Sequence, residues 1–302
     1  MTKKQREDLD AILRHGPLDL GGDVAEQRAL FHEMIAGIPL PDDVTATEGE
    51  LGGVPVVTVE TEGSDPASVL FYLHGGAYAV GSAADSVGLA SDVARRVGAR
   101  AISIEYRLAP EHQFPAAVDD AVAAYRALLE SGTPSARIAF VGESAGGGLV
   151  AATLVAIKDA GLPQPACAAM LSPWADLTVS GESALGKAAV DPALTPKALR
   201  TRALDYLGDT DPATPLASPI FADLAGLPPL LVQVGSHEIL LDDAVRLAAR
   251  AGAADVAVQL QVWPEVPHVF QSFAAILDEA GAALDAVGAF ILRSWAAAEE
   301  EA

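Results

Sequence analysis

The sequence of 302 residues predicts an α/β fold, in which helices cover both faces of a mostly parallel sheet. Two observations lead to this prediction. Short and nearly continuous apolar runs alternate along the chain with longer segments of helical periodicity, as expected for parallel strands that are buried on both faces. Hydrophobic residues make up 51% of the chain and charged residues 20%, so a large core can form and a disordered chain is excluded.

Each apolar run is expected to form a strand, because β-branched and other apolar residues dominate it. The expected strands are residues 54–59, 69–73, 101–104, 138–141, 168–171, 230–234 and 256–262. Helical spacing fills most of the segments between them. The expected helices are residues 85–97, 116–129, 147–158, 242–251 and 270–295. Sites in such sheets lie at the carboxyl ends of the strands, so the chemistry is expected in the segments that follow the strands.

Two regions depart from this alternation. Residues 1–45 contain apolar positions at helical spacing, among them Leu9, Ile12 and Leu13, and we expect two amphipathic cap helices there. Residues 178–214 are rich in Pro and Asp and are expected to form an inserted cap segment. The remainder, residues 46–302, is expected to form one α/β domain that contains this inserted segment.

Charge and composition limit the partners of the protein. It has 19 basic and 41 acidic residues, a net charge of −22, which disfavours nucleic acid and anionic membrane surfaces as partners. The single cysteine, Cys167, excludes an internal disulfide and a site with several thiolate ligands. The first residues are charged and lead to no apolar signal segment, and the apolar stretch 145–157 is shorter than the roughly 20 residues that span a bilayer. We expect a cytoplasmic protein.

The strongest chemical signal is the run Gly142-Glu143-Ser144-Ala145-Gly146, which follows an expected strand and opens an expected helix. This strand–turn–helix context is that of a nucleophile elbow, a tight turn that lifts a serine hydroxyl clear of the sheet. Small neighbours are needed in such a turn, and the helix N-terminus favours developing negative charge. We therefore predict Ser144 as the nucleophile.

A second signal is the run His74-Gly75-Gly76-Ala77, directly after the expected strand 69–73. Glycines allow backbone N–H groups to approach a reacting carbonyl closely, and acyl transfer needs such donors where the oxyanion forms. We predict an oxyanion hole made by the amides of Gly75, Gly76 and Ala145. His74 is expected to orient this turn rather than to act as a base.

The base and the acid of a triad are expected after the last two strands. His268, in Pro267-His268-Val269-Phe270, is predicted as the general base, and the chain order Ser, acid, His is the one expected for this type of sheet. Three carboxylates compete for the role of acid. Glu238 is preferred because it lies nearest the end of strand 230–234, whereas Asp242 and Asp243 are explained by a position at the start of a helix.

These motifs resemble those of the hormone-sensitive-lipase-like family of α/β-hydrolases, the bacterial esterases with an H-G-G oxyanion motif. The matching stretches are Tyr72–Tyr78, Tyr106–Glu111, Phe114–Ala116, Gly142–Gly147, Ser172–Trp174 and Pro267–Phe270. The resemblance implies an α/β-hydrolase fold with residues 46–302 as the catalytic domain, an eight-stranded sheet and a helical cap. It also implies hydrolysis of small carboxylic esters without a cofactor or metal, and a homodimer. The sequence departs from the family at Glu238, where Asp is more common, and at Glu143, where one subgroup has Asp and another Thr.

The predicted function is that of a serine esterase, which hydrolyses short-chain carboxylic esters through an acyl-enzyme. A lactone or acetyl-ester hydrolase that uses the same triad is the nearest alternative. A ligand-binding protein on a disabled hydrolase fold is an alternative of another class, which is disfavoured because Ser144, His268 and an acid are all present.

Overall fold

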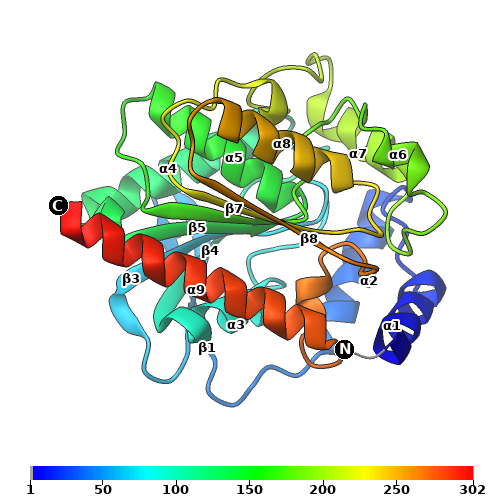
Figure 1. The fold of residues 1–302 in the computed structure, drawn as a ribbon, viewed down its shortest axis with the longest axis horizontal. Coiled ribbons are helices and arrows are strands. Elements are labelled where there is room, and N and C mark those ends of the chain that lie inside the picture. Colours follow the sequence, from blue (N-terminus) through cyan, green and yellow to red (C-terminus); the bar gives the residue numbers. More distant parts are fainter. Residues whose placement is uncertain (1–2, 302) are drawn as a thin grey trace.

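An eight-stranded sheet forms the centre of the molecule in the computed structural model, which describes residues 3–301 (Figure 1). The strands are β1 (Thr45–Leu51), β2 (Val54–Glu60), β3 (Asp65–Leu73), β4 (Ala99–Ile104), β5 (Ile138–Glu143), β6 (Cys167–Leu171), β7 (Leu230–Gly235) and β8 (Val258–Trp263). Their order is β1-β2-β4-β3-β5-β6-β7-β8. β2 pairs antiparallel with β1 and β4, and the pairs from β4 to β8 are all parallel.

Helices cover both faces of the sheet, with α3 and α9 on one face and α4, α5 and α8 on the other (Figure 1). The helices are α1 (Lys3–His15), α2 (Val24–Ala36), α3 (Val87–Val97), α4 (Ala116–Glu130), α5 (Ala145–Asp159), α6 (Ser183–Gly186), α7 (Pro196–Leu207), α8 (Leu241–Ala253) and α9 (Asp278–Glu301). The predicted fold class is confirmed.

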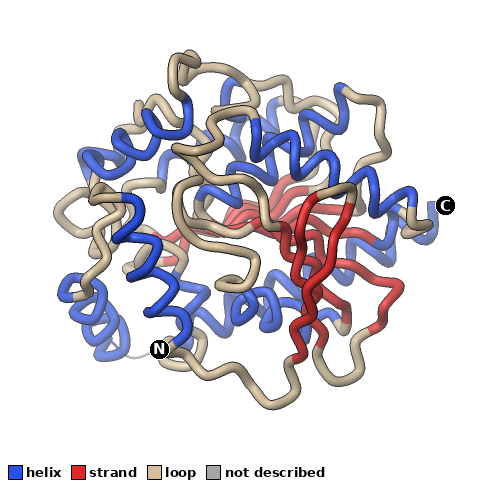
Figure 2. The backbone as a smooth tube through the Cα atoms, turned by 180° about the vertical axis from the view of Figure 1, so that it is seen from behind, coloured by secondary structure: helices blue, strands red, loops and turns tan. Residues whose placement is uncertain are grey.

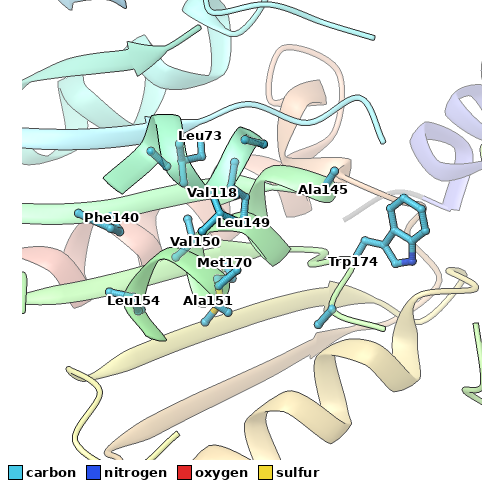
Figure 3. Packing of buried hydrophobic residues seen from close by; sticks show 14 of the residues in the cluster. Leu73, Val118, Phe140, Ala145, Leu149, Val150, Ala151, Leu154, Met170 and Trp174 are labelled. Atoms are coloured by element: carbon cyan, nitrogen blue, oxygen red, sulfur yellow. The ribbon is translucent and has the colours of Figure 1, made fainter. Parts of the chain in front are cut away.

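Helix α5 is central to the site because its first residue directly follows Ser144. Its side chains are almost all buried, and Leu149, Val150 and Leu154 pack in one cluster with Phe140 of β5 and Met170 of β6 (Figure 3). Burying an apolar side chain of this size contributes about 1.5–3 kcal/mol. The start of α5 is therefore fixed to the sheet beneath it.

The structure differs from the sequence prediction at two elements. Strand β1 was not expected, since its sequence is polar and its residues are exposed at the edge of the sheet, which leaves no hydrophobic alternation to detect. The expected helix 270–295 is divided: Phe270–Phe273 forms a short 3₁₀ turn, and α9 begins only at Asp278.

The two expected cap regions lie at the same end of the molecule, with α1 and α2 near α6 and α7 (Figures 1 and 2). Arg202 of α7 donates to the carbonyl oxygen of Gly22 at 3.0 Å, and Arg14 of α1 donates to that of Val190 at 3.1 Å. Side chains of the inserted segment and of the N-terminal region thus hold the two regions together.

Candidate active site

Ser144 occupies the sharp turn between β5 and α5, with a left-handed φ of 56° and a ψ of −123°. The glycines around it are required by close backbone contacts. A Cβ at Gly146 would overlap the carbonyl oxygens of Leu73 and His74, and one at Gly142 would lie 2.5 Å from the carbonyl oxygen of Gly146. The turn therefore stores strain that only the packed sheet sustains, as expected for an exposed nucleophile.

The imidazole of His268 lies against Ser144. The loop after β8 carries His268, and its Nε2 is 2.9 Å from the hydroxyl oxygen of Ser144. The opposite ring nitrogen, Nδ1, is 2.8 Å from Oε2 of Glu238. A carboxylate can only accept, so Nδ1 carries the proton and Nε2 is free to accept the proton of Ser144.

Glu238 is fully buried at the end of β7 and accepts three hydrogen bonds. Besides His268, the Ser172 hydroxyl and the Gly235 amide both donate to its Oε1, each at 2.6 Å. Burial raises the pKa of Glu238 above its ordinary value, and the hydrogen bond and charge of His268 oppose this shift. Three converging donors favour the ionised carboxylate, the form that orients an imidazole.

The competing carboxylates point elsewhere. Asp242 accepts from the Ser183 amide at 2.7 Å, and buried Asp243 accepts from the amides of Ala175 and Asp176 at 3.0 and 2.9 Å. Both lie in the first turn of α8, as the sequence predicts. Neither contacts His268, so Glu238 is the carboxylate that the fold brings to the imidazole.

Of the three amides predicted for the oxyanion hole, that of Gly75, in the turn after β3, is already bound to a side chain. The Gly75 amide donates to Oε1 of Glu143 at 2.7 Å and is not available to an oxyanion, because a carboxylate already occupies it. The amides of Gly76 and Ala145 have no protein acceptor among residues 3–301. Gly76 has a φ of 112°, and a Cβ there would overlap the Val80 carbonyl oxygen, so only glycine fits.

His74 is buried within the turn. Its ring stacks on Tyr106 with centroids 4.2 Å apart, and its Nδ1–H donates to the carbonyl oxygen of Gly75 at 2.7 Å. Burial lowers the pKa of His74 to about 4, so the ring is neutral near pH 7. These contacts hold the His74 ring within the turn and fix the orientation of the Gly75 carbonyl group.

Sequence reasoning missed three residues that support the site. Ser172 donates a hydrogen bond to Glu238, and Glu143 accepts one from the Gly75 amide in the glycine turn. Both residues lie within recognised motifs, but nothing in the sequence indicates that their side chains make these bonds. Arg28 of α2 donates to the carbonyl oxygens of Ala79 and Ala109 at 2.7 and 2.9 Å. No pattern in the N-terminal sequence indicates that an arginine reaches the region next to the glycine turn.

A cavity of about 300 Å³ lies beside the loop that carries His268. Helix α1, the inserted segment and the loops after β7 and β8 all contribute to its wall. Its lining residues are Lys3, Arg6, Glu7, Asp10, Pro192, His237, Glu265 and Pro267.

Within the described part of the chain, no group of three His, Cys, Asp or Glu side chains could hold a metal ion, and no helix is long and apolar enough to cross a membrane.

Fold and site together define a hydrolase of the α/β class with a serine nucleophile. Comparison with known proteins agrees: residues 70–272 match the family described as alpha/beta hydrolase fold. An acetyl-hydrolase of Streptomyces hygroscopicus is 48% identical over 222 residues, 74% of each chain. An esterase of Acinetobacter venetianus is 37% identical over 80% of this chain and 79% of its own.

Solved structures narrow the family further. The crystal structure of an esterase from the bacterial hormone-sensitive lipase family superposes with a TM-score of 0.94 at 42% identity, covering 98% of this chain and 99% of the other. This chain therefore belongs to the alpha/beta hydrolase fold family, and its predicted resemblance to the hormone-sensitive-lipase-like esterases is confirmed.

Proposed function

We propose that this protein is a serine carboxylesterase that hydrolyses short-chain carboxylic esters through an acyl-enzyme. One observation carries the proposal: the hydroxyl of Ser144, the imidazole of His268 and the carboxylate of Glu238 form an unbroken chain of contacts at 2.9 and 2.8 Å. A non-catalytic binding protein would have no need to keep this arrangement intact on a strained turn. The relatives named esterase and acetyl-hydrolase support the same class of enzyme.

The first half of the reaction transfers the acyl group to the protein. The Ser144 oxygen attacks the ester carbonyl carbon while His268 Nε2 takes the hydroxyl proton. Negative charge develops on the carbonyl oxygen, and the amides of Gly76 and Ala145 are the donors proposed for it, aided by the N-terminus of α5. His268 then protonates the leaving alcohol oxygen, the carbon–oxygen bond breaks, and the acyl group remains on Ser144.

The second half releases the acid. Water attacks the acyl carbon and gives its proton to His268, and the resulting tetrahedral intermediate expels the Ser144 oxygen, which regains its proton from the imidazole. Glu238 keeps the imidazole in the reactive tautomer and stabilises its charged form in both halves. The products are a carboxylic acid and an alcohol, and the protein returns to its starting state.

Acetyl esters are the substrate group that the comparisons favour, since one relative is named acetyl-hydrolase. The test is a series of p-nitrophenyl esters from acetate to dodecanoate with purified protein, and Ser144→Ala as the control for background hydrolysis. We expect kcat/KM to be highest for the shortest acyl chains. A maximum at long chains would refute the short-chain assignment, and absence of turnover of every ester would refute the esterase itself.

Three further features belong to the proposal. Residues 1–45 and the segment 178–214 act as a cap over the catalytic domain, supported by the bonds of Arg202 and Arg14 between them. The protein works in the cytoplasm and forms a homodimer. Cell fractionation with an activity assay tests the location, and light scattering of the purified protein tests the dimer. Deletion of residues 1–45 tests the cap, since removal of a cap should change the preferred size of the substrate.

A further inference from the structure

We propose that Glu143 is a positioning residue that locks the glycine turn of the oxyanion hole. This inference rests on the proposed function, since a turn matters for catalysis only if an oxyanion forms beside it. Glu143 is the last residue of β5 and directly precedes Ser144. Its carboxylate bridges the end of β3 and the turn that follows it, because Oε1 accepts from the Gly75 amide and Oε2 from the Tyr72 hydroxyl, each at 2.7 Å.

Several other bonds hold the glycine turn, among them those from the Ala79 and Val80 amides to the Gly76 carbonyl oxygen at 3.0 and 2.9 Å, but none of them reaches the Gly75 amide. Two successive glycines have a wide choice of backbone conformations, so the turn needs external bonds to keep one of them. Tyr106 donates to the carbonyl oxygen of His74 at 2.7 Å, and His74 donates to that of Gly75 at 2.7 Å. Glu143 supplies the bond to the remaining polar group of Gly75, its amide.

The contact between Glu143 and Gly75 lies directly beside Ser144. A Cβ at Gly75 would be 3.2 Å from the Cβ of Ser144 and 3.3 Å from the Cγ of Glu143, so no side chain separates the turn from the elbow. A change in the Gly75 peptide must also move the next amide in the chain, that of Gly76. Displacement of a catalytic group by about 1 Å can reduce a rate by about 10²-fold.

The carboxylate is the natural acceptor for this purpose. Bonds from N–H to an ionised acceptor are roughly twice as strong as neutral ones. Burial raises the pKa of Glu143 to about 7, and the bonds from Tyr72 and Gly75 and the charge of His268 oppose this rise. The other titratable neighbours, Tyr72 and Tyr106, are uncharged near neutral pH because burial raises the pKa of both hydroxyls. His268 is thus the group whose charge couples to Glu143.

Two substitutions separate the acceptor from the charge. Glu143→Ala removes the acceptor and leaves the Gly75 amide without a partner. Glu143→Gln keeps an oxygen for that amide and places an NH₂ group against the Tyr72 oxygen, but it removes the charge. We expect the alanine variant to lose about 10²-fold in kcat with p-nitrophenyl acetate and little in KM, because the oxyanion exists only in the transition state. The glutamine variant should keep kcat close to the original value at pH 8.

A pH profile distinguishes this role from a merely structural one. Glu143 loses its charge as the pH falls through its pKa of about 7, whereas a glutamine is uncharged at every pH. The original protein should therefore lose kcat/KM relative to Glu143→Gln between pH 8 and pH 6. Glu105 provides the matched control, since its carboxylate accepts from the Ala83 amide at 2.6 Å but does not touch the glycine turn. Glu105→Gln should show no such change relative to the original protein.

The outcomes are decisive in both directions. A folded Glu143→Ala protein with unchanged kcat, or a Glu143→Gln protein that loses as much kcat as the alanine variant, would overturn the proposal. If the alanine variant does not fold, the glutamine variant decides, and a pH profile of kcat/KM identical to that of the original protein would overturn the proposal. Hydrogen exchange of the Gly75 amide does not depend on turnover and should be faster in Glu143→Ala, because the amide has lost its acceptor. An unchanged exchange rate would overturn the role of Glu143 whether or not the protein is an esterase.

Discussion

Replacement of Glu238 by glutamine gives a sharp test of the predicted triad. Oε1 of Glu238 accepts from two donors, the Ser172 hydroxyl and the Gly235 amide, whereas among residues 3–301 Oε2 accepts from His268 Nδ1 alone. In Glu238→Gln the carbonyl oxygen must therefore remain at the position of Oε1. The opposite orientation would leave two buried donors facing an NH₂ group, at a cost of about 1–3 kcal/mol for each unsatisfied group.

This orientation fixes the wrong tautomer of the base. The glutamine NH₂ group then donates to His268 Nδ1, the imidazole proton moves to Nε2, and Nε2 can no longer accept the proton of Ser144. Loss of the reactive tautomer in a triad lowers kcat by about 10⁴-fold, which corresponds to about 5.4 kcal/mol in the activation free energy. Glu238→Ala leaves Nδ1 without an orienting partner and should also lose most activity.

The fold should survive this change. Burial raises the pKa of Glu238, and a carboxyl with a raised pKa destabilises the folded state when it is ionised, at pH values above its pKa in the unfolded chain. Glutamine removes that charge, so the Tm at pH 8 should be equal to or higher than that of the original protein. Kinetics with p-nitrophenyl acetate and a thermal melt measure both effects.

Variants of the competing carboxylates complete the test. Asp242→Asn should retain kcat within a few-fold, because the Asp242 carboxylate bonds to the Ser183 amide and not to the imidazole. Activity of Glu238→Gln within tenfold of the original protein would refute the tautomer reasoning. A larger loss in Asp242→Asn than in Glu238→Gln, with both proteins folded, would move the acid to Asp242.

Three other predictions follow from the same structure. Ser144→Ala should abolish ester turnover and leave the Tm nearly unchanged, as measured with p-nitrophenyl acetate and a thermal melt, since within residues 3–301 the Ser144 hydroxyl makes a hydrogen bond to His268 alone. Gly146→Ala should destabilise the protein by about 3 kcal/mol or more in chemical denaturation, because its Cβ overlaps the backbone oxygen of Leu73, whereas a Cβ at Gly186 meets no atom within 4 Å and Gly186→Ala is its control. Leu9→Ala should cost about 2–5 kcal/mol by the same measurement, because Leu9 is fully buried against the loop that carries His268.

Each of these has a contradicting result. Residual turnover in Ser144→Ala above the background of buffer would exclude Ser144 as the nucleophile. Equal stability of the Gly146→Ala and Gly186→Ala proteins would show that the elbow is less crowded than its backbone contacts indicate. A Leu9→Ala protein as stable as the original would mean that α1 is not anchored by this residue.

Local patterns account for most of the agreement between sequence and structure. The strands formed by buried apolar runs lie close to the predicted residues. A strand that is buried on both faces is apolar along its whole length, so its sequence alone indicates it. The predicted run 138–141, for example, lies within β5, Ile138–Glu143. Strand β1 has no such run, and its place depends on hydrogen bonds to β2 that no local pattern records. Helix α9 begins at Asp278, later than predicted, because Phe270 and Phe273 have the spacing of a helix but form a 3₁₀ turn.

By itself the sequence determined the fold class and the elements that carry Ser144, His268 and Glu238, because periodicity and glycine-rich turns are local properties of the chain. Only the tertiary structure decided which carboxylate reaches the imidazole and which amides of the glycine turn stay free. Both depend on where the ends of separate strands meet. Glu143 and Gly75 are 68 positions apart in the chain, and parallel pairing of β3 with β5 brings them to a contact of 2.7 Å.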